Sequence, residues 1–309
     1  SVQAGIQGGA DAVSLTMSGH VGKTSAIGSL SSEPGVVGPF GSDQTIYGLN
    51  LDGVSVVSTG RIGIAGSIDQ GPNASPFSNH ASAAVYIGNT TVSSVFDLVI
   101  EADASGSKPA GSSNTPGAFL DSSRLDSARG DLRIQGVGAS GAARSGLLYG
   151  NSGIFADSVN LSAVSGFVVL DGQGGATTFP PSNVDGPFAP GMNLGIMLSS
   201  VHLSGSGFDI SGTGGAALSG DGNGGVYLSE SILQATGFAP SQVQGSASVG
   251  QDLNFGVLIG PGTGAETRLQ TTGDLLIRGN GSGGSVGDFN IGVFIGEDAS
   301  VIVDNPQSG

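Results

Sequence analysis

The chain of 309 residues contains 58 Gly, 13 Pro and no Cys, and its 9 Lys plus Arg against 24 Asp plus Glu give a formal net charge of −15. Such an acidic chain repels phosphate backbones and anionic lipids, which argues against nucleic-acid binding and against adsorption to anionic membranes. The lack of Cys excludes disulfides, thiolate metal sites and a cysteine nucleophile. The sequence contains no apolar run of about 18 residues, so it predicts no transmembrane helix.

One degenerate unit repeats from the beginning of the chain to its end. Most units open with Gly-apolar-x-apolar, continue with a second alternating run and a further Gly, and end with a third run. Because runs of period 2 are typical of strands, and glycines permit turns with φ > 0, each unit predicts three short strands. The opening positions, spaced by about 36 residues, are Gly5 (a weak match), Gly48, Ala84 (where Gly is replaced), Gly117, Gly153, Gly195, Gly225, Gly256 and Gly292.

Three short strands per unit, without helical periodicity, predict one turn of a parallel β-helix. Each strand would pair with its counterpart in the next unit, about 4.8 Å along the axis. A propeller blade has four antiparallel strands and a longer repeat, so it fits less well. We therefore expect an all-β, single-stranded parallel β-helix of about nine rungs. Residues 1–309 would form one continuous solenoid, expected to be a segment of a longer repeat protein because neither end looks capped.

The length of the unit varies mainly between the third run and the next opening Gly. The longest of these connections span residues 23–47 and 172–193. We expect them to lie along one edge of the rod, where an array of repeats carries its individual function. In one unit, Phe238-Ala239-Pro240 stands where the third strand should begin. Because Pro cannot donate to a strand ladder, we expect a distorted rung there.

Several units share a more specific motif. It is seen in residues 193–199 (NLGIMLS), 254–260 (NFGVLIG) with 272–281 (TGDLLIRGNG), and 290–296 (NIGVFIG). These repeats resemble those of large bacterial exoproteins, the filamentous-haemagglutinin-like and autotransporter-like adhesins. The resemblance implies a right-handed parallel β-helix that is exported to the cell surface and used in adhesion or as a fibre.

The middle residue of each first strand is predicted to point out of the coil, because its two apolar neighbours point inward. We call this row the outward ladder: Asn50, Tyr86, Phe119, Phe155, Met197, Tyr227, Leu258 and Phe294. The seven residues after Asn50 are apolar or aromatic and form the candidate partner surface, since a continuous apolar row should not remain in water. Three explanations stay open. Loops fold back over the ladder with Phe40, Phe77, Phe179 or Phe188, copies associate laterally, or sugars stack on the aromatic rings.

Two pairs of Asp residues are expected to lie in register on adjacent rungs. Asp121 and Asp157 both sit four residues after an opening Gly, while Asp97 and Asp131 both begin a third strand. Like charges about 5 Å apart repel unless a cation bridges them, so these residues are weak candidates for calcium ligands. Solvated turn residues are the alternative, because Asp is common in turns. No metal site or other cofactor is assigned from the sequence.

No catalytic residues can be assigned. His20, His80 and His202 lie in different units. The Gly-x-Ser-x-Gly pattern at Ser285 is not followed by the helical periodicity that a nucleophile elbow requires. Glu101, Asp171 and Arg278 occupy equivalent third-strand positions, but two or more rungs separate them, roughly 10 Å or more, so they are not expected to form one cluster.

The sequence therefore favours a non-enzymatic extracellular or cell-surface protein, an adhesin-like β-helix. Such a protein would associate with itself, laterally or end to end, or with a host or matrix surface that includes glycans. The alternative is a carbohydrate-active β-helix enzyme, a polysaccharide lyase or glycoside hydrolase, which rests on fold analogy alone.

Overall fold

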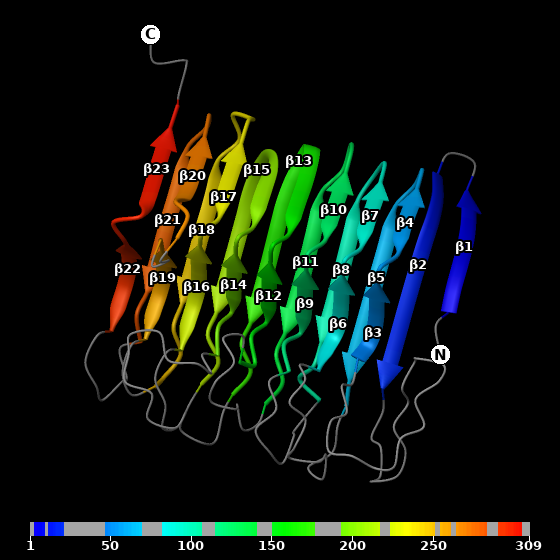
Figure 1. Cartoon of the computed structure of the whole chain (residues 1–309), viewed down its shortest axis with the longest axis horizontal. Coiled ribbons are helices and arrows are strands. Elements are labelled where there is room, and N and C mark those ends of the chain that lie inside the picture. The colour runs from blue at the N-terminus through cyan, green and yellow to red at the C-terminus, as the bar shows by residue number, and fades with distance from the viewer. Residues whose placement is uncertain are drawn as a thin grey trace.

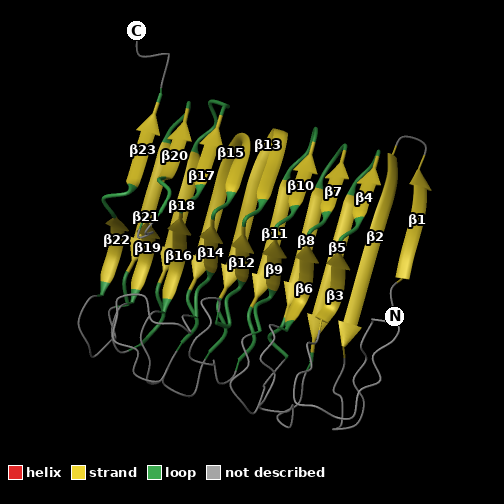
Figure 2. Ribbon diagram, in the orientation of Figure 1, coloured by secondary structure: helices red, strands yellow, loops and turns green. Residues whose placement is uncertain are grey.

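The computed structural model describes residues 3–9, 12–21, 47–69, 82–106, 115–140, 150–176, 193–216, 223–250, 254–260, 264–282 and 290–304. This part of the chain is a parallel β-solenoid in which strands stack side by side along one long axis (Figures 1 and 2). It contains 23 strands and no α-helix. Accordingly, no helix in the described residues is long and apolar enough to cross a membrane.

The strands form three faces. The first face is an eight-stranded sheet in which all neighbours are parallel. Its strands are β3 (Tyr47–Asp52), β6 (Ala83–Gly88), β9 (Ala118–Asp121), β12 (Ile154–Asp157), β14 (Ile196–Ser199), β16 (Gly224–Ser229), β19 (Phe255–Ile259) and β22 (Ile291–Ile295).

The second and third faces belong to one larger sheet of 15 strands, because the long strands β13 (Asn160–Gln173) and β15 (His202–Thr213) run through both. The second face adds β4 (Ser55–Ser58), β7 (Thr91–Ser94), β10 (Arg124–Ser127), β17 (Ile232–Ala235), β20 (Thr267–Thr271) and β23 (Ala299–Val303). The third face adds β2 (Ala12–Val21), β5 (Ile62–Ile68), β8 (Leu98–Asp103), β11 (Leu132–Val137), β18 (Ser241–Ser246) and β21 (Leu275–Asn280).

The prediction of nine rungs is wrong at the N-terminal end. The unit that opens at Gly5 does not form a rung. Its strand β1 (Gln3–Gly9) pairs antiparallel with β2, with Gly5 opposite Thr16. The first face consequently has eight strands instead of nine. The unit was the weakest match to the repeat, and a hairpin of two neighbouring strands can form without any partner from another unit.

The core lies inside the coil and is built from rows of like residues. One row on the third face joins Ile64, Ile100, Ile134, Leu170 and Ile210, which pair in sequence across β5, β8, β11, β13 and β15. All five side chains are buried. Burying such a side chain contributes about 1.5–3 kcal/mol, so stacking identical rows stabilises the solenoid without any disulfide.

The opening glycines have a different role from the one that we expected. Positive φ occurs at Gly53, Gly150 and Gly260 among the described glycines, and not at the glycines that open the units. Instead, the first and third faces approach each other so closely that a Cβ on Gly256 would lie 2.2 Å from the backbone nitrogen of Asn280. The glycines are therefore required by backbone contact between two sheets.

The corner between the first and second faces is a repeated tight turn. Asn89, Ser122, Ser158, Ser200 and Glu230 stand at this corner in successive rungs, with φ between 47° and 56°. The N–H groups of four of them donate to the next rung; that of Ser122, for example, donates to the carbonyl of Asp157 at 3.0 Å. Non-glycine residues are rare in this left-handed conformation, and the hydrogen bonds between rungs offset its cost.

The distortion predicted at Pro240 lies in the corner before the third strand, where residues 236–241 stand opposite only residues 206–208 of the preceding rung. Residues 236–240 lie outside the strands, with Phe238 exposed, and the third strand of this unit begins at Ser241 as β18. β18 pairs in register with β15 on one side and β21 on the other. The chain thus places Pro240 just before the strand, where no ladder hydrogen bond is lost. The long connections 23–46 and 177–192 fall outside the described residues.

Candidate binding face on the first sheet

The outward ladder is continuous in the structure. Every residue of the row is paired with the next one, from Asn50 and Tyr86 on β3 and β6 to Leu258 and Phe294 on β19 and β22. Its central members form a hydrophobic cluster separate from the core inside the coil. The predicted orientation of this row is therefore confirmed.

The rings in the N-terminal half of the ladder, together with Tyr47 on the strand of Asn50, pack on one another along the solenoid axis. Tyr47 and Tyr86 are stacked, with ring centroids 4.8 Å apart and an interplanar angle of 22°. Tyr86 and Phe119 meet edge to face at 5.3 Å, and Phe119 and Phe155 do so at 5.1 Å. Aromatic pairs in these geometries stabilise each other by about 0.5–1.5 kcal/mol beyond burial. The ring faces are thus engaged by neighbouring rings, which disfavours a platform for stacking sugars.

Burial of the ladder changes along its length. Phe155, Met197, Tyr227 and Leu258 are no more than 7% exposed, whereas Phe294 at the end is 42% exposed. Tyr86 and Phe119 are half-buried. Leu194 and Phe255 belong to the same cluster, and Ile291 packs against it. Phe40, Phe77, Phe179 and Phe188, the residues expected to cover the ladder, lie outside the described residues. The centre of the ladder is thus already removed from water.

Two tyrosines of the ladder have a perturbed pKa. Burial raises the pKa of Tyr227 above its ordinary value of 10.0, and Glu230 raises it further, against an opposing hydrogen bond with Ser229. Burial also raises the pKa of Tyr86, with smaller contributions from the carboxylates of Asp121 and Asp52. Both effects disfavour the charged phenolate, so both side chains stay neutral on this apolar face.

A row of asparagines runs beside the ladder; three of them begin the shared motifs at residues 193, 254 and 290, but their hydrogen bonds to one another were not predicted. Asn193, Asn223, Asn254 and Asn290 each stand two residues before an opening Gly, on consecutive rungs. The amide of Asn193 donates to Asn223 at 3.4 Å, Asn223 donates to Asn254 at 3.3 Å, and Asn254 donates to Asn290 at 3.0 Å. The spacing Asn-x-Gly was the available signal. Stacked amides of this kind tie each rung to the next.

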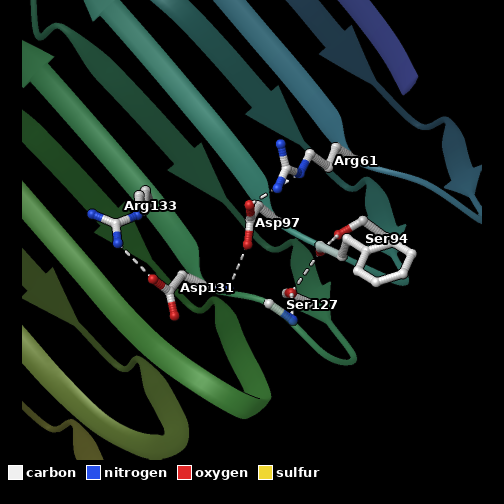
Figure 3. A network of polar contacts seen from close by, with 8 residues as sticks. Arg61, Ser94, Asp97, Ser127, Asp131 and Arg133 are labelled. Atoms are coloured by element: carbon white, nitrogen blue, oxygen red, sulfur yellow. Dashed lines mark hydrogen bonds and ion pairs between the residues drawn. The ribbon is translucent and has the colours of Figure 1, made fainter. Parts of the chain in front are cut away.

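Asp97 and Asp131 bind the protein's own groups (Figure 3). One carboxylate oxygen of Asp97 accepts the N–H of Asp131 at 3.1 Å. One oxygen of Asp131 accepts the N–H of Phe167 at 2.9 Å. Their other oxygens form ion pairs with Arg61 and Arg133, respectively. Each carboxylate thus links its rung to the following rung, and a bridging cation would have to displace these partners.

Asp121 and Asp157 are directly paired on β9 and β12, as expected. The hydroxyl of Ser122 donates to Asp121 at 2.9 Å. In the part of the chain that the structure describes, no group of three or more His, Asp or Glu side chains could hold a metal ion. The two Asp residues end β9 and β12, directly before Ser122 and Ser158 at the first corner of the coil.

The candidates for catalysis do not converge. Glu101, Gln135 and Asp171 lie in one row on β8, β11 and β13, so a full strand separates the two carboxylates. Arg278 lies in the same row on β21, with β15 and β18 between it and Asp171. The predicted separation of these three side chains is confirmed. His202 lies on β15 of the second face, and His80 is outside the described residues.

The last described rung exposes apolar side chains that earlier rungs bury. Ile295 pairs with the fully buried Ile259 but is itself 48% exposed. Val301 pairs with the buried Leu269 and is also exposed. Within the described residues, β22 and β23 each have a strand partner on one side only. This end thus combines exposed core side chains with unpaired backbone groups.

A comparison with protein-family models, with curated proteins and with solved structures found no match. The fold itself places the chain in the class of parallel β-solenoids, with turns of about 36 residues.

Proposed function

We propose that this protein is a non-enzymatic structural or adhesive β-solenoid of the extracellular space or cell surface, and that it associates end to end. The observation that carries the proposal is the exposed apolar last rung, β22 and β23. The acidic, Cys-free composition and the resemblance to exoprotein repeats support the extracellular location.

The burial pattern favours association at the end over association along the side. Phe155 through Leu258 are buried, so the centre of the outward ladder offers little apolar surface to a lateral partner. In contrast, Val293 and Ile295 on β22 and Val303 on β23 are all exposed. An edge strand with free N–H and C=O groups next to exposed apolar side chains is a template for pairing with another strand.

Light scattering after gel filtration tests this proposal. We expect the purified chain to form species larger than a monomer as its concentration rises. Ile295→Lys introduces a charge at the inward position of the last rung and should shift the chain to monomer. The matched control is Val164→Lys, because Val164 is 68% exposed on β13 in the middle of the solenoid, away from both ends. Circular dichroism verifies that both variants fold. Equal association of Ile295→Lys and the unchanged chain would refute the proposal.

The alternative, a carbohydrate-active enzyme, has less support because Glu101, Asp171 and Arg278 do not form one cluster. Gln135 separates the two carboxylates in their row, and β15 and β18 separate Asp171 from Arg278. Release of reducing ends or unsaturated products from a panel of acidic and neutral polysaccharides would favour the enzyme. We expect no turnover on any of them.

A further inference from the structure

The outer surface of the third face has a groove that none of the preceding sites uses. Its volume is about 660 Å³, and it crosses β2, β5, β8 and β11. Its polar side chains point away from the core, since they alternate along each strand with buried residues such as Ile64, Ile100 and Ile134. These polar side chains are Ser18, His20, Ser67, Glu101, Asp103 and Gln135.

The strand register arranges these groups in two rows along the solenoid axis. In one row, Glu101 lies between Ala65 and Gln135. In the other row, Ser67 lies between His20 and Asp103. Both carboxylates come from β8, so negative charge is concentrated near the middle of the groove and neutral polar groups flank it on both sides.

Several of these groups are available to a ligand. Within the described part of the chain, no hydrogen bond or ion pair engages the carboxylate of Glu101 or the amide of Gln135. Asp103 accepts the N–H of Ser105 at 2.8 Å through one oxygen, which leaves the other oxygen open. The ring of His20 is joined to the hydroxyl of Ser67 through Nδ1 at 2.8 Å, and its Nε2 has no such partner. Glu101 and Asp103 are exposed, and their carboxylate oxygens can accept charge-assisted hydrogen bonds from a ligand that carries positive charge.

The lining also excludes other ligand classes. Two carboxylates repel acidic chains. No aromatic side chain is among the described lining residues, so stacking of flat rings is not supported. The backbone groups of the four strands are paired within the sheet, so a peptide would find no strand edge to extend here. Recognition must come from side chains, most of which accept hydrogen bonds from ligand hydroxyl and ammonium groups.

We propose that this groove binds a chain of amino sugars. An ammonium group of the ligand would lie against Glu101 and Asp103, and hydroxyl groups of the adjoining sugars would meet Ser18, the His20–Ser67 pair and Gln135. This site goes beyond the proposed end-to-end association and does not depend on it, since β22 and β23 lie at the opposite end of the solenoid (Figure 1).

Titration calorimetry of the full chain with a hexamer of glucosamine tests the site. We expect saturable binding that Glu101→Gln or Asp103→Asn each weakens about tenfold, as the loss of one charge-assisted hydrogen bond predicts. The matched control is Asp171→Asn. Asp171 lies in the same row as Glu101 and is exposed, but it does not line the groove, so its variant loses the same charge without affecting binding. Melting curves establish that all three variants are folded.

Three further probes identify the ligand class. The hexamer of N-acetylglucosamine keeps the hydroxyl groups but lacks the charge, and we expect it to bind at least tenfold more weakly. A galacturonic acid oligomer should not bind. Hexalysine has the charge without the sugar, and its binding should not depend on Glu101. The proposal is overturned if the glucosamine hexamer does not bind, if the acidic oligomer binds equally well, or if Asp171→Asn weakens binding as much as Glu101→Gln. Hexalysine binding that Glu101→Gln abolishes would overturn the assignment to sugars.

Discussion

Gly172 on the third face lies so close to Gly195 on the first face that a Cβ atom on Gly172 would approach the carbonyl oxygen of Gly195 to 2.2 Å. Such a contact is not tolerated between real atoms, so Gly172→Ala must push the two faces apart. We expect it to destabilise the fold by about 1–3 kcal/mol, in the range of overpacked cores. Thermal unfolding followed by circular dichroism measures the effect. The control is Gly63→Ala, since a Cβ on Gly63 would find its nearest neighbour at 3.8 Å, an ordinary contact. A smaller loss for Gly172→Ala than for Gly63→Ala would contradict this account.

The repeat made the fold predictable, because spacing and alternation alone define which residues point inward. The register of the outward ladder from Asn50 to Phe294 follows from aligning the opening glycines, and the structure has the same register. The antiparallel pairing of β1 and β2 could not be predicted in this way, because the segment that begins at Gly5 matches the repeat only weakly. A hairpin and a rung use the same alternation of residues, and only tertiary pairing distinguishes them.

The sites were harder to predict than the fold. The repeat shows which residues align in a row, but it does not show which side chains form hydrogen bonds or ion pairs. Asp97 and Asp131 were placed correctly on adjacent rungs, yet their bonds to backbone N–H groups and to Arg61 and Arg133 depend on three-dimensional geometry. The groove on the third face was missed for a similar reason. His20, Ser67 and Asp103 come from three units and become neighbours only through the strand register.

The asparagine row gives a second test of stability. Asn223 both accepts a hydrogen bond from Asn193 and donates one to Asn254, and it is fully buried. Asn223→Ala removes both bonds and leaves polar groups of its neighbours without this partner, which should cost about 1–3 kcal/mol. Asn290→Ala at the exposed end of the row should cost less. Chemical denaturation of both variants measures the two losses in free energy of unfolding. Equal losses would contradict a stabilising role for the buried amides of this row.

Asp131 allows its hydrogen bond to be separated from its ion pair. Asp131→Asn keeps an oxygen that can accept the N–H of Phe167 but loses the charge that pairs with the exposed Arg133. Because exposed ion pairs contribute little, we expect a change below about 1 kcal/mol. Asp131→Ala loses both interactions and should be more destabilising by about 1 kcal/mol. Equal unfolding temperatures of the two variants would contradict a stabilising hydrogen bond between Asp131 and the N–H of Phe167.

Alkaline pH should weaken the fold through Tyr227. Burial raises the pKa of Tyr227 in the folded state above the ordinary value of 10.0 that applies in the unfolded chain. The unfolded state therefore loses its proton first, so this contribution to stability is complete below pH 10.0 and is lost as the pH rises through the folded-state pKa. Melting temperatures measured between pH 9 and pH 12 should fall less steeply for Tyr227→Phe, which keeps the ring. An identical pH dependence of the melting temperature in Tyr227→Phe and the unchanged chain would contradict the raised pKa of Tyr227.

End-to-end association is the central claim, and electron microscopy of the purified chain at several concentrations tests it most directly. The exposed Ile295 and Val303 on the last rung predict particles that grow along the solenoid axis as the concentration rises, with constant width. Single rods of one length at every concentration would contradict the account.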